Sequence, residues 1–185
     1  MSDHTPLLVL GLGNVLLADD GVGSAAVTEL RDRYEPCDGA RVLDGGTLGL
    51  SLLPYLDQAD IVILVDAIRA DAPPGSFVRL DGDEVGPAVA TRLSPHQIGV
   101  ADLLDGARWL DRYPARVILL GLVPESIELA IGLTPHVARA LPCLVTRIVL
   151  EAAALGFPFR AKARHASPLA GAIDVARLAL PAGGW

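Results

Sequence analysis

Short apolar runs alternate with longer amphipathic stretches along most of the chain. Runs typical of β-strands occupy residues 7–10, 40–44, 59–67, 75–84 and 115–123. Stretches with helical periodicity occupy residues 22–34, 50–58, 96–113 and 135–155. Short apolar strands that alternate with helices are typical of a parallel sheet covered on both faces. The pattern therefore predicts an α/β fold with a mostly parallel sheet.

Three segments fit this alternation less regularly. Residues 126–133 (SIELAIGL) are expected to add an edge strand. Pro142 lies inside the last helical stretch, where it should kink the helix or make it restart. Residues 156–185 have weak periodicity and are rich in proline, glycine and alanine. We therefore expect an α/β domain over residues 1–155 and a partly disordered or loosely packed tail over 156–185.

Composition narrows the classes of function. Apolar residues make up 51% of the chain, and the net charge is −7, which argues against binding to a nucleic-acid backbone. No apolar run approaches the roughly 20 residues of a membrane-spanning helix. The N-terminal residues lack the features of a signal peptide, so a cytoplasmic protein is expected. Cys37 and Cys143 match no metal or disulfide framework and are expected to be buried or half-buried thiols.

A glycine-rich loop, GLGNVLLADDGVG, follows the first predicted strand. It resembles a nucleotide-binding loop, but Leu16 occupies the third position of the glycine fingerprint. Asp19 and Asp20 would also compete with a phosphate for the positive end of the following helix. Nucleotide binding is therefore disfavoured, and Asp20 is either the N-cap of that helix or a functional carboxylate.

Two further acidic positions fall at the same predicted edge of the sheet, where the strands end. The sequence DGGTLG (residues 44–49) follows the second strand, and its glycines either form a tight turn or admit the backbone of a substrate. Asp66 ends the very apolar run IVILV. A carboxylate at such a position needs a partner, which is either a turn contact with residues 67–69 or a ligand.

The sequence SPHQ (residues 94–97) has the pattern of a capped helix start and places His96 in the first turn. The helix dipole there favours the neutral, metal-binding imidazole. His136 follows a similar TPH sequence without the capping glutamine and is expected to be an ordinary helix-start residue. Asp20, Asp66 and His96 together form an incomplete ligand set for a divalent metal such as nickel or zinc.

Five blocks of the sequence resemble, in order, the hydrogenase maturation endopeptidase family. They are LGLGNVLLADDGVGSAAVTEL, DGGTLGLSLLPYL, ADIVILVDAI, SPHQIGVADLL and GLVPESIELAIGLTPHV. The resemblance implies a single-domain α/β/α sandwich with a mostly parallel, twisted sheet. It also implies removal of a C-terminal extension from the precursor of a nickel–iron hydrogenase large subunit, after nickel insertion.

The resemblance assigns both metal binding and catalysis to Asp20, Asp66 and His96, with the nickel carried by the precursor and a free enzyme that is expected to be monomeric. The family usually has glutamate at the position of Asp20 and glycine at that of Ala18, so the choice of Asp20 over Asp19 is the least secure. Either the metal or an aspartate activates the water. A non-catalytic, nickel-dependent chaperone of the same precursor is the alternative function.

Overall fold

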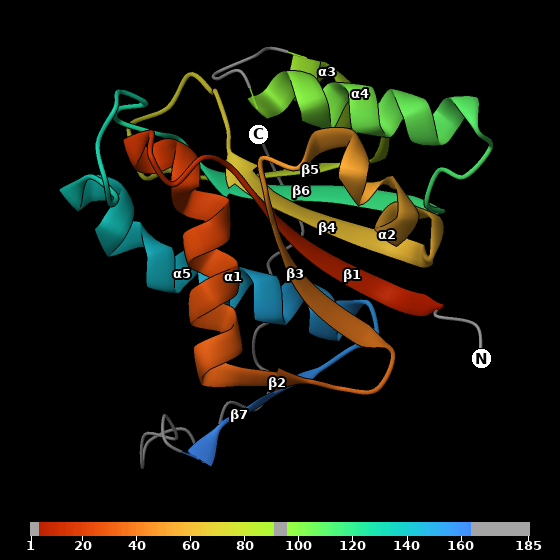
Figure 1. Cartoon of the computed structure of the whole chain (residues 1–185). Helices are drawn as coiled ribbons and strands as arrows, with labels where there is room; N and C mark the ends of the chain where they lie inside the picture. Colours follow the sequence, from red (N-terminus) through yellow and green to blue (C-terminus); the bar gives the residue numbers. More distant parts are fainter. Residues whose placement is uncertain (1–3, 91–95, 164–185) are drawn as a thin grey trace, which may run out of the picture.

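The computed structural model describes residues 4–90 and 96–163, with backbone alone for residues 90 and 96–98. Five of the described strands form one sheet in the order β3-β1-β4-β6-β5 (Figure 1). Their bounds are β1 Thr5–Leu12, β3 Ala40–Gly46, β4 Ala59–Ala67, β5 Phe77–Asp81 and β6 Arg116–Leu122. β5 pairs antiparallel with β6, and the other pairs are parallel. The predicted mostly parallel sheet is confirmed.

Helices cover both faces of the sheet (Figure 1). One layer holds α1 (Val22–Arg33) and α5 (Pro135–Ala154). The other holds η2 (Gly49–Leu52), α2 (Leu53–Asp57), α3 (Val85–Ala90) and α4 (His96–Trp109). This is the α/β/α sandwich that the alternation of patterns and the resemblance predict.

Successive side chains of β1 point to opposite faces of the sheet and so belong to two separate halves of the core. Leu7 and Val9 pack with α1 and α5, whereas Leu8 and Leu10 pack with α2, α3 and α4. All four side chains are buried because the strand has helices on both sides. Because both faces of β1 are buried, its sequence is continuously apolar and does not alternate between apolar and polar residues.

The chain leaves neighbouring strands β1 and β4 in opposite directions along the sheet. From β1 it passes through α1 to β3, and from β4 it continues to β5 and β6 on the other side. The carboxyl ends of two strands whose connections diverge leave a crevice between them, where ligands bind in open α/β sheets. The topology therefore places a candidate site between the ends of β1 and β4.

Gly23 lets helix α1 lie unusually close to this edge. A Cβ atom at Gly23 would come 2.1 Å from the Val65 oxygen and 2.3 Å from the Leu12 oxygen. No larger residue fits there without moving the helix away from the strand ends. The glycine therefore serves helix–strand packing.

Some sequence-based expectations differ from the structure. Residues 126–133 form no strand: within the described chain only an isolated bridge joins Leu17 to Ala130. The segment is fixed instead by hydrogen bonds to a buried side chain, described below, which strand propensity does not reveal. Helix α5 passes through Pro142 without restarting, because buried residues on both sides of the proline hold it against the sheet.

Residues 156–163 of the predicted tail belong to the described part of the chain and include a strand. β7 (Phe159–Ala161) pairs antiparallel with β2 (Tyr34–Pro36) at the end of α1. Phe157 and Phe159 also pack against the core, which explains why residues 156–163 are held. Residues 164–185 of the predicted tail lie outside the described part of the chain.

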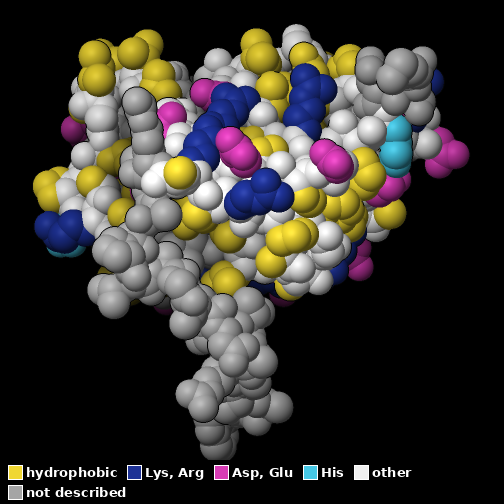
Figure 2. Space-filling model, turned by 90° about the horizontal axis from the view of Figure 1, so that it is seen from below, with side chains coloured by type: hydrophobic (Ala, Val, Ile, Leu, Met, Phe, Trp, Pro, Cys, Tyr) yellow, Lys and Arg dark blue, Asp and Glu magenta, His cyan; other side chains and the backbone are white. Residues whose placement is uncertain are grey.

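Acidic and basic side chains are intermingled on the face of the molecule shown in Figure 2. Several such groups form ion pairs between elements, for example Arg79 with Glu151 and Arg116 with Asp81. No helix in the described regions is long and apolar enough to cross a membrane.

Candidate functional site

Asp20 and Asp66 lie at the crevice between the ends of β1 and β4. Asp20 belongs to η1 (Ala18–Gly21), the turn that joins the β1 loop to α1 and packs against β4. Asp66 is the penultimate residue of β4. Their exposed fractions are 0% and 2%, so both carboxylates are largely withdrawn from bulk water. Buried carboxylates at a switch point are candidates for chemistry rather than for solubility.

Asp20 is not the N-cap of α1. The cap position is Gly21, and no side chain caps this helix. The Asp20 carboxylate instead accepts a hydrogen bond from the backbone amide of Asn14, at 2.9 Å from Oδ2. This contact folds the β1 loop back over the edge of the sheet and holds the carboxylate there.

Asp66 does make the turn contact considered as an alternative to a ligand role. Its Oδ1 accepts a hydrogen bond from the Ala67 amide at 2.7 Å. On the neighbouring strand β6, Gly121 pairs with Asp66. A Cβ atom at Gly121 would come 2.0 Å from the backbone oxygen of Asp66. The close approach of β6 fixes the backbone from which the Asp66 side chain emerges.

The described part of helix α4 spans His96–Trp109, so His96 lies in a helix as the sequence predicts. Its first turn lies beside η2, since a Cβ at Gly99 would come 3.1 Å from the Gly49 Cα. The start of α4 is therefore near the carboxyl end of β3, at the same edge as Asp20 and Asp66. The His96 side chain and the capping residues 94 and 95 lie outside the described residues.

Among the side chains that are described, no group of three or more histidine, cysteine, aspartate or glutamate residues is arranged to hold a metal ion. The third predicted ligand, His96, is not part of that set. The convergence of Asp20, Asp66 and His96 on one ion therefore stays a prediction.

Asp19 has a different part from its neighbour. It is fully buried, and its carboxylate accepts hydrogen bonds from the amides of Glu125, Ser126 and Thr134 at 2.7–3.1 Å. The Thr134 hydroxyl donates a fourth bond at 2.9 Å. Asp19 therefore fixes the loop between β6 and α5 against η1, and Asp20 is the acid that remains at the crevice.

The glycines of residues 44–49 are accounted for by a tight turn. Gly46 and Gly49 have positive φ angles of 46° and 51°. The Asp44 carboxylate accepts hydrogen bonds from the Gly46 amide and the Ser24 hydroxyl. Asp44 therefore ties the turn after β3 to helix α1.

Exposed apolar side chains surround the crevice. Val15 and Leu16 precede η1, and Leu129 and Ile131 belong to the loop after β6. The two segments are joined by the Ala130 amide, which donates to the Leu16 oxygen, and by the Ala18 amide, which donates to the Ala130 oxygen. We call these four residues the apolar rim. Their exposed fractions range from 52% for Leu16 to 90% for Ile131.

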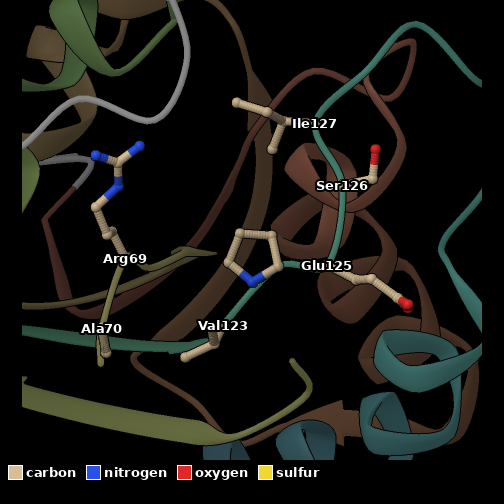
Figure 3. Close-up of a pocket in the computed structure, with 7 residues that line it drawn as sticks. Arg69, Ala70, Val123, Glu125, Ser126 and Ile127 are labelled. Atoms are coloured by element: carbon tan, nitrogen blue, oxygen red, sulfur yellow. The ribbon is translucent and has the colours of Figure 1, made fainter. Parts of the chain in front are cut away.

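A pocket of about 270 Å³ opens beside the strand ends (Figure 3). It is lined by Arg69, Ala70, Val123, Pro124, Glu125, Ser126 and Ile127. The sequence analysis did not predict that Arg69 lines a pocket. Its position three residues after Asp66, at the end of a buried strand, was the available signal.

His136 is an exposed residue in the first turn of α5, and it also makes an ion pair. Its Nδ1 lies 2.8 Å from the Glu125 carboxylate. This hydrogen bond, with a second from Thr134, lowers the pKa of the Glu125 carboxyl. The pair stabilises the same loop that Asp19 holds.

Neither cysteine lies at this edge. Cys37 lines a separate pocket beside β2 and β7 and is half-buried. Cys143 is exposed on α5, so the prediction of a buried or half-buried thiol is wrong for this residue. The buried stripe of that helix is formed by other positions, including Leu144 and Val145.

Fold and site together define an open-sheet α/β protein with two carboxylates held at the switch point of its sheet. The family model for hydrogenase maturation protease matches residues 25–151. The Hydrogenase 2 maturation protease of Escherichia coli strain K12 is 42% identical over 132 residues, which are 71% of this chain and 80% of that protein.

Solved structures agree. The hydrogenase maturating endopeptidase HybD from E. coli superposes with a TM-score of 0.81 at 34% identity, covering 86% of this chain and 99% of its own. The [NiFe] hydrogenase maturation protease HybD from Thermococcus kodakarensis has a TM-score of 0.65 at 28% identity, covering 80% and 99%. The chain belongs to the hydrogenase maturation protease family, and the protein is an endopeptidase of that family.

Proposed function

We propose that this endopeptidase removes the C-terminal extension of a nickel–iron hydrogenase large-subunit precursor after nickel has been inserted. The archaeal relative described as a [NiFe] hydrogenase maturation protease supports this substrate class. The observation that carries the proposal is the position of Asp20 and Asp66, two buried carboxylates at the switch point, one in η1 after the β1 loop and one at the end of β4.

The donor set suits the nickel of the precursor. Carboxylate oxygens and a neutral imidazole are ligands that first-row divalent metals accept. Asp20 and Asp66 would supply the oxygens, and His96, at the start of α4, would supply the nitrogen. In this arrangement the metal acts as a recognition element, because only a loaded precursor completes the contact.

Hydrolysis then requires an activated water near the scissile bond. Bound nickel supplies Lewis acidity that polarises a carbonyl or a water. Alternatively, one of the two aspartates accepts the proton of the water as a general base. A cysteine nucleophile does not fit, because Cys37 and Cys143 both lie away from the crevice.

The apolar rim supports a protein substrate. Monomeric proteins rarely expose clustered large apolar side chains without a binding role. Ile131 and Leu129 are 90% and 82% exposed, yet their segment is held by backbone hydrogen bonds. A rigid apolar surface beside the carboxylates suits the docking of a folded precursor.

The test is cleavage of a nickel-loaded precursor by purified Asp66→Asn, Asp20→Asn and His96→Ala variants, followed by intact-mass spectrometry. We expect each variant to lose at least about 10³-fold in rate, since the loss of a group that binds or activates at the reacting centre has effects of this size. Asp60→Asn, at an exposed acid on β4, is the matched control and should cleave normally.

Two outcomes would contradict the proposal. Full-rate cleavage by a folded Asp66→Asn variant would remove the site, and equal cleavage of nickel-free precursor would remove the recognition role of the metal. Binding of loaded precursor by the wild-type protein without any shortening would favour the chaperone alternative.

A further inference from the structure

The pocket that opens after the end of β4 contains a cation, Arg69. The Arg69 side chain is exposed, and among residues 4–90 and 96–163 no hydrogen bond or ion pair engages its guanidinium group. In Figure 3, Arg69 and Ile127 face each other across the open space, while the Glu125 side chain points away from it. Glu125 is already paired with His136.

The pocket combines apolar walls with one basic side chain. Ala70, Val123, Pro124 and Ile127 give it apolar walls, and Arg69 gives it one positive charge. An unpaired guanidinium beside apolar groups is suited to a carboxylate, which it binds through two parallel hydrogen bonds.

The backbone just before Arg69 is anchored to the sheet next to Asp66. The ladder between β4 and β6 continues past Asp66, because the Ile68 amide donates to the Leu122 oxygen at 3.0 Å. The chain leaves the sheet at the next residue. Arg69 is therefore three residues from the carboxylate at the crevice, close enough for the pocket to receive a group near the scissile bond.

From this geometry we propose that the pocket of Arg69 is a specificity subsite for a carboxylate carried by the segment that is cleaved off. The inference rests on the proposed function. Asp20 and Asp66 repel a substrate carboxylate, and the chain as a whole has a net charge of −7. Arg69 offsets this repulsion at one place, so it selects where the acidic group of the leaving segment lies.

The experiment measures kcat and KM for cleavage of the nickel-loaded precursor by Arg69→Gln, Arg69→Lys and Arg69→Glu. We expect Arg69→Gln to lower kcat/KM by about 10- to 100-fold, mainly through KM, which is the range for a charge-assisted hydrogen bond. Arg69→Lys should retain part of the activity, and Arg69→Glu should be the least active. Arg139→Glu, an exposed arginine on α5 that does not line the pocket, makes the same change in net charge as Arg69→Glu and should stay within about twofold of the wild type.

Two precursor variants separate the possible sources of the carboxylate. In one, the acidic side chains of the extension are replaced by amides. In the other, two glycines are added to the C-terminus, which displaces the terminal carboxylate. The wild-type enzyme should cleave the precursor variant that lacks the recognised carboxylate as slowly as the Arg69→Gln enzyme cleaves the original precursor. With that precursor variant, Arg69→Gln should cause no further loss of rate.

A failure of this inference is distinguishable from a failure of the proposed function. If the wild-type enzyme cleaves the precursor but Arg69→Glu and Arg139→Glu have the same kcat/KM, the subsite does not exist. The same conclusion follows if Arg69→Gln slows both precursor variants as much as the original. An inactive wild-type enzyme would instead contradict the proposed function.

Discussion

Two adjacent aspartates in one loop have different surroundings. Asp19 accepts four hydrogen bonds from the loop between β6 and α5, whereas the Asp20 carboxylate accepts a hydrogen bond from the amide of Asn14 in the β1 loop. Their order in the sequence did not distinguish them, because the donors to Asp19 lie more than 100 positions away. Only the fold brings those amides to it.

Asp19→Asn should lower the free energy of unfolding by about 2–4 kcal/mol. The amide group of asparagine cannot accept the hydrogen bonds made by one carboxylate oxygen, so buried donors lose their partner. Denaturation by urea checks this value. Asp60→Asn removes an exposed acid paired with His4 and should change stability by less than about 0.5 kcal/mol. A similarly small change for Asp19→Asn would show that the loop is held by other contacts.

Among the elements, helix α5 shows how packing can override local preference. Pro142 cannot donate a hydrogen bond to the preceding turn, yet the helix continues to Ala154. Val137, Leu144, Val145 and Ile148 are fully buried on either side of it. Burial of this apolar stripe outweighs the cost of one proline.

Pro142→Ala should therefore stabilise the protein by about 1–2 kcal/mol, since the restored hydrogen bond outweighs the greater freedom of the unfolded chain. Pro142 is exposed, so little packing is lost. Thermal and urea unfolding measure the gain. The neighbouring exposed residue gives a control, Cys143→Ala, which should be close to neutral. Destabilisation by Pro142→Ala would mean that the proline itself contributes to the packing or rigidity of the helix.

An ion-pair network links β5, β6 and α5. Asp81 accepts hydrogen bonds from Arg116 and Arg79, and Arg79 also binds Glu151 on α5. The bond from Arg116 is the main cause that lowers the pKa of the Asp81 carboxyl to about 2, from an ordinary value of 3.8. The charged form is therefore favoured in the folded state.

A folded-state pKa below the unfolded value gives stability that is present above about pH 4 and lost as the pH falls toward 2. Asp81→Asn should lower the free energy of unfolding by about 1 kcal/mol at pH 7, because solvent screening reduces the effect of the pKa shift at this partly exposed site, and the difference from the wild type should shrink between pH 4 and 2. Urea titrations of both proteins across this range measure it. A difference that stays constant with pH would show that the ion pairs do not set it.

At the scale of the whole molecule, loops from distant parts of the chain form one surface around the crevice. The apolar rim combines Val15 and Leu16 with Leu129 and Ile131, which follow them by more than 110 positions. Backbone hydrogen bonds of Ala130 with Leu16 and Ala18 join the two segments that carry the rim. The rim and the carboxylates are therefore held in a fixed relation.

Replacing both Leu129 and Ile131 with glutamate should lower kcat/KM for the precursor by at least about tenfold, because apolar contact with the docked protein is lost. Stability should be nearly unchanged, since both side chains are exposed. Trp109→Glu is the matched control, because Trp109 is 93% exposed at the end of α4, near the amino ends of the strands. If the rim variant and the control cleave equally fast, docking occurs elsewhere.

The sequence by itself determined the five strands of the main sheet and most of the helices, with their order. Unbroken apolar runs such as residues 59–67 predict strands buried on both faces, and β4 has these same bounds. It also placed Asp20 in the loop after the first strand and Asp66 at the end of the third. These features are local, since they depend on the chemistry of neighbouring residues and on the period of the backbone.

The tertiary structure alone decided which groups surround each of these side chains. The crevice arises because the chain leaves β1 and β4 in opposite directions, which no local pattern encodes. The separation of Asp19 from Asp20 and the pocket of Arg69 depend on the loop after β6, contributed by residues 123–134. Contacts between distant segments form only when the sheet has assembled, so their positions follow from packing rather than from sequence periodicity.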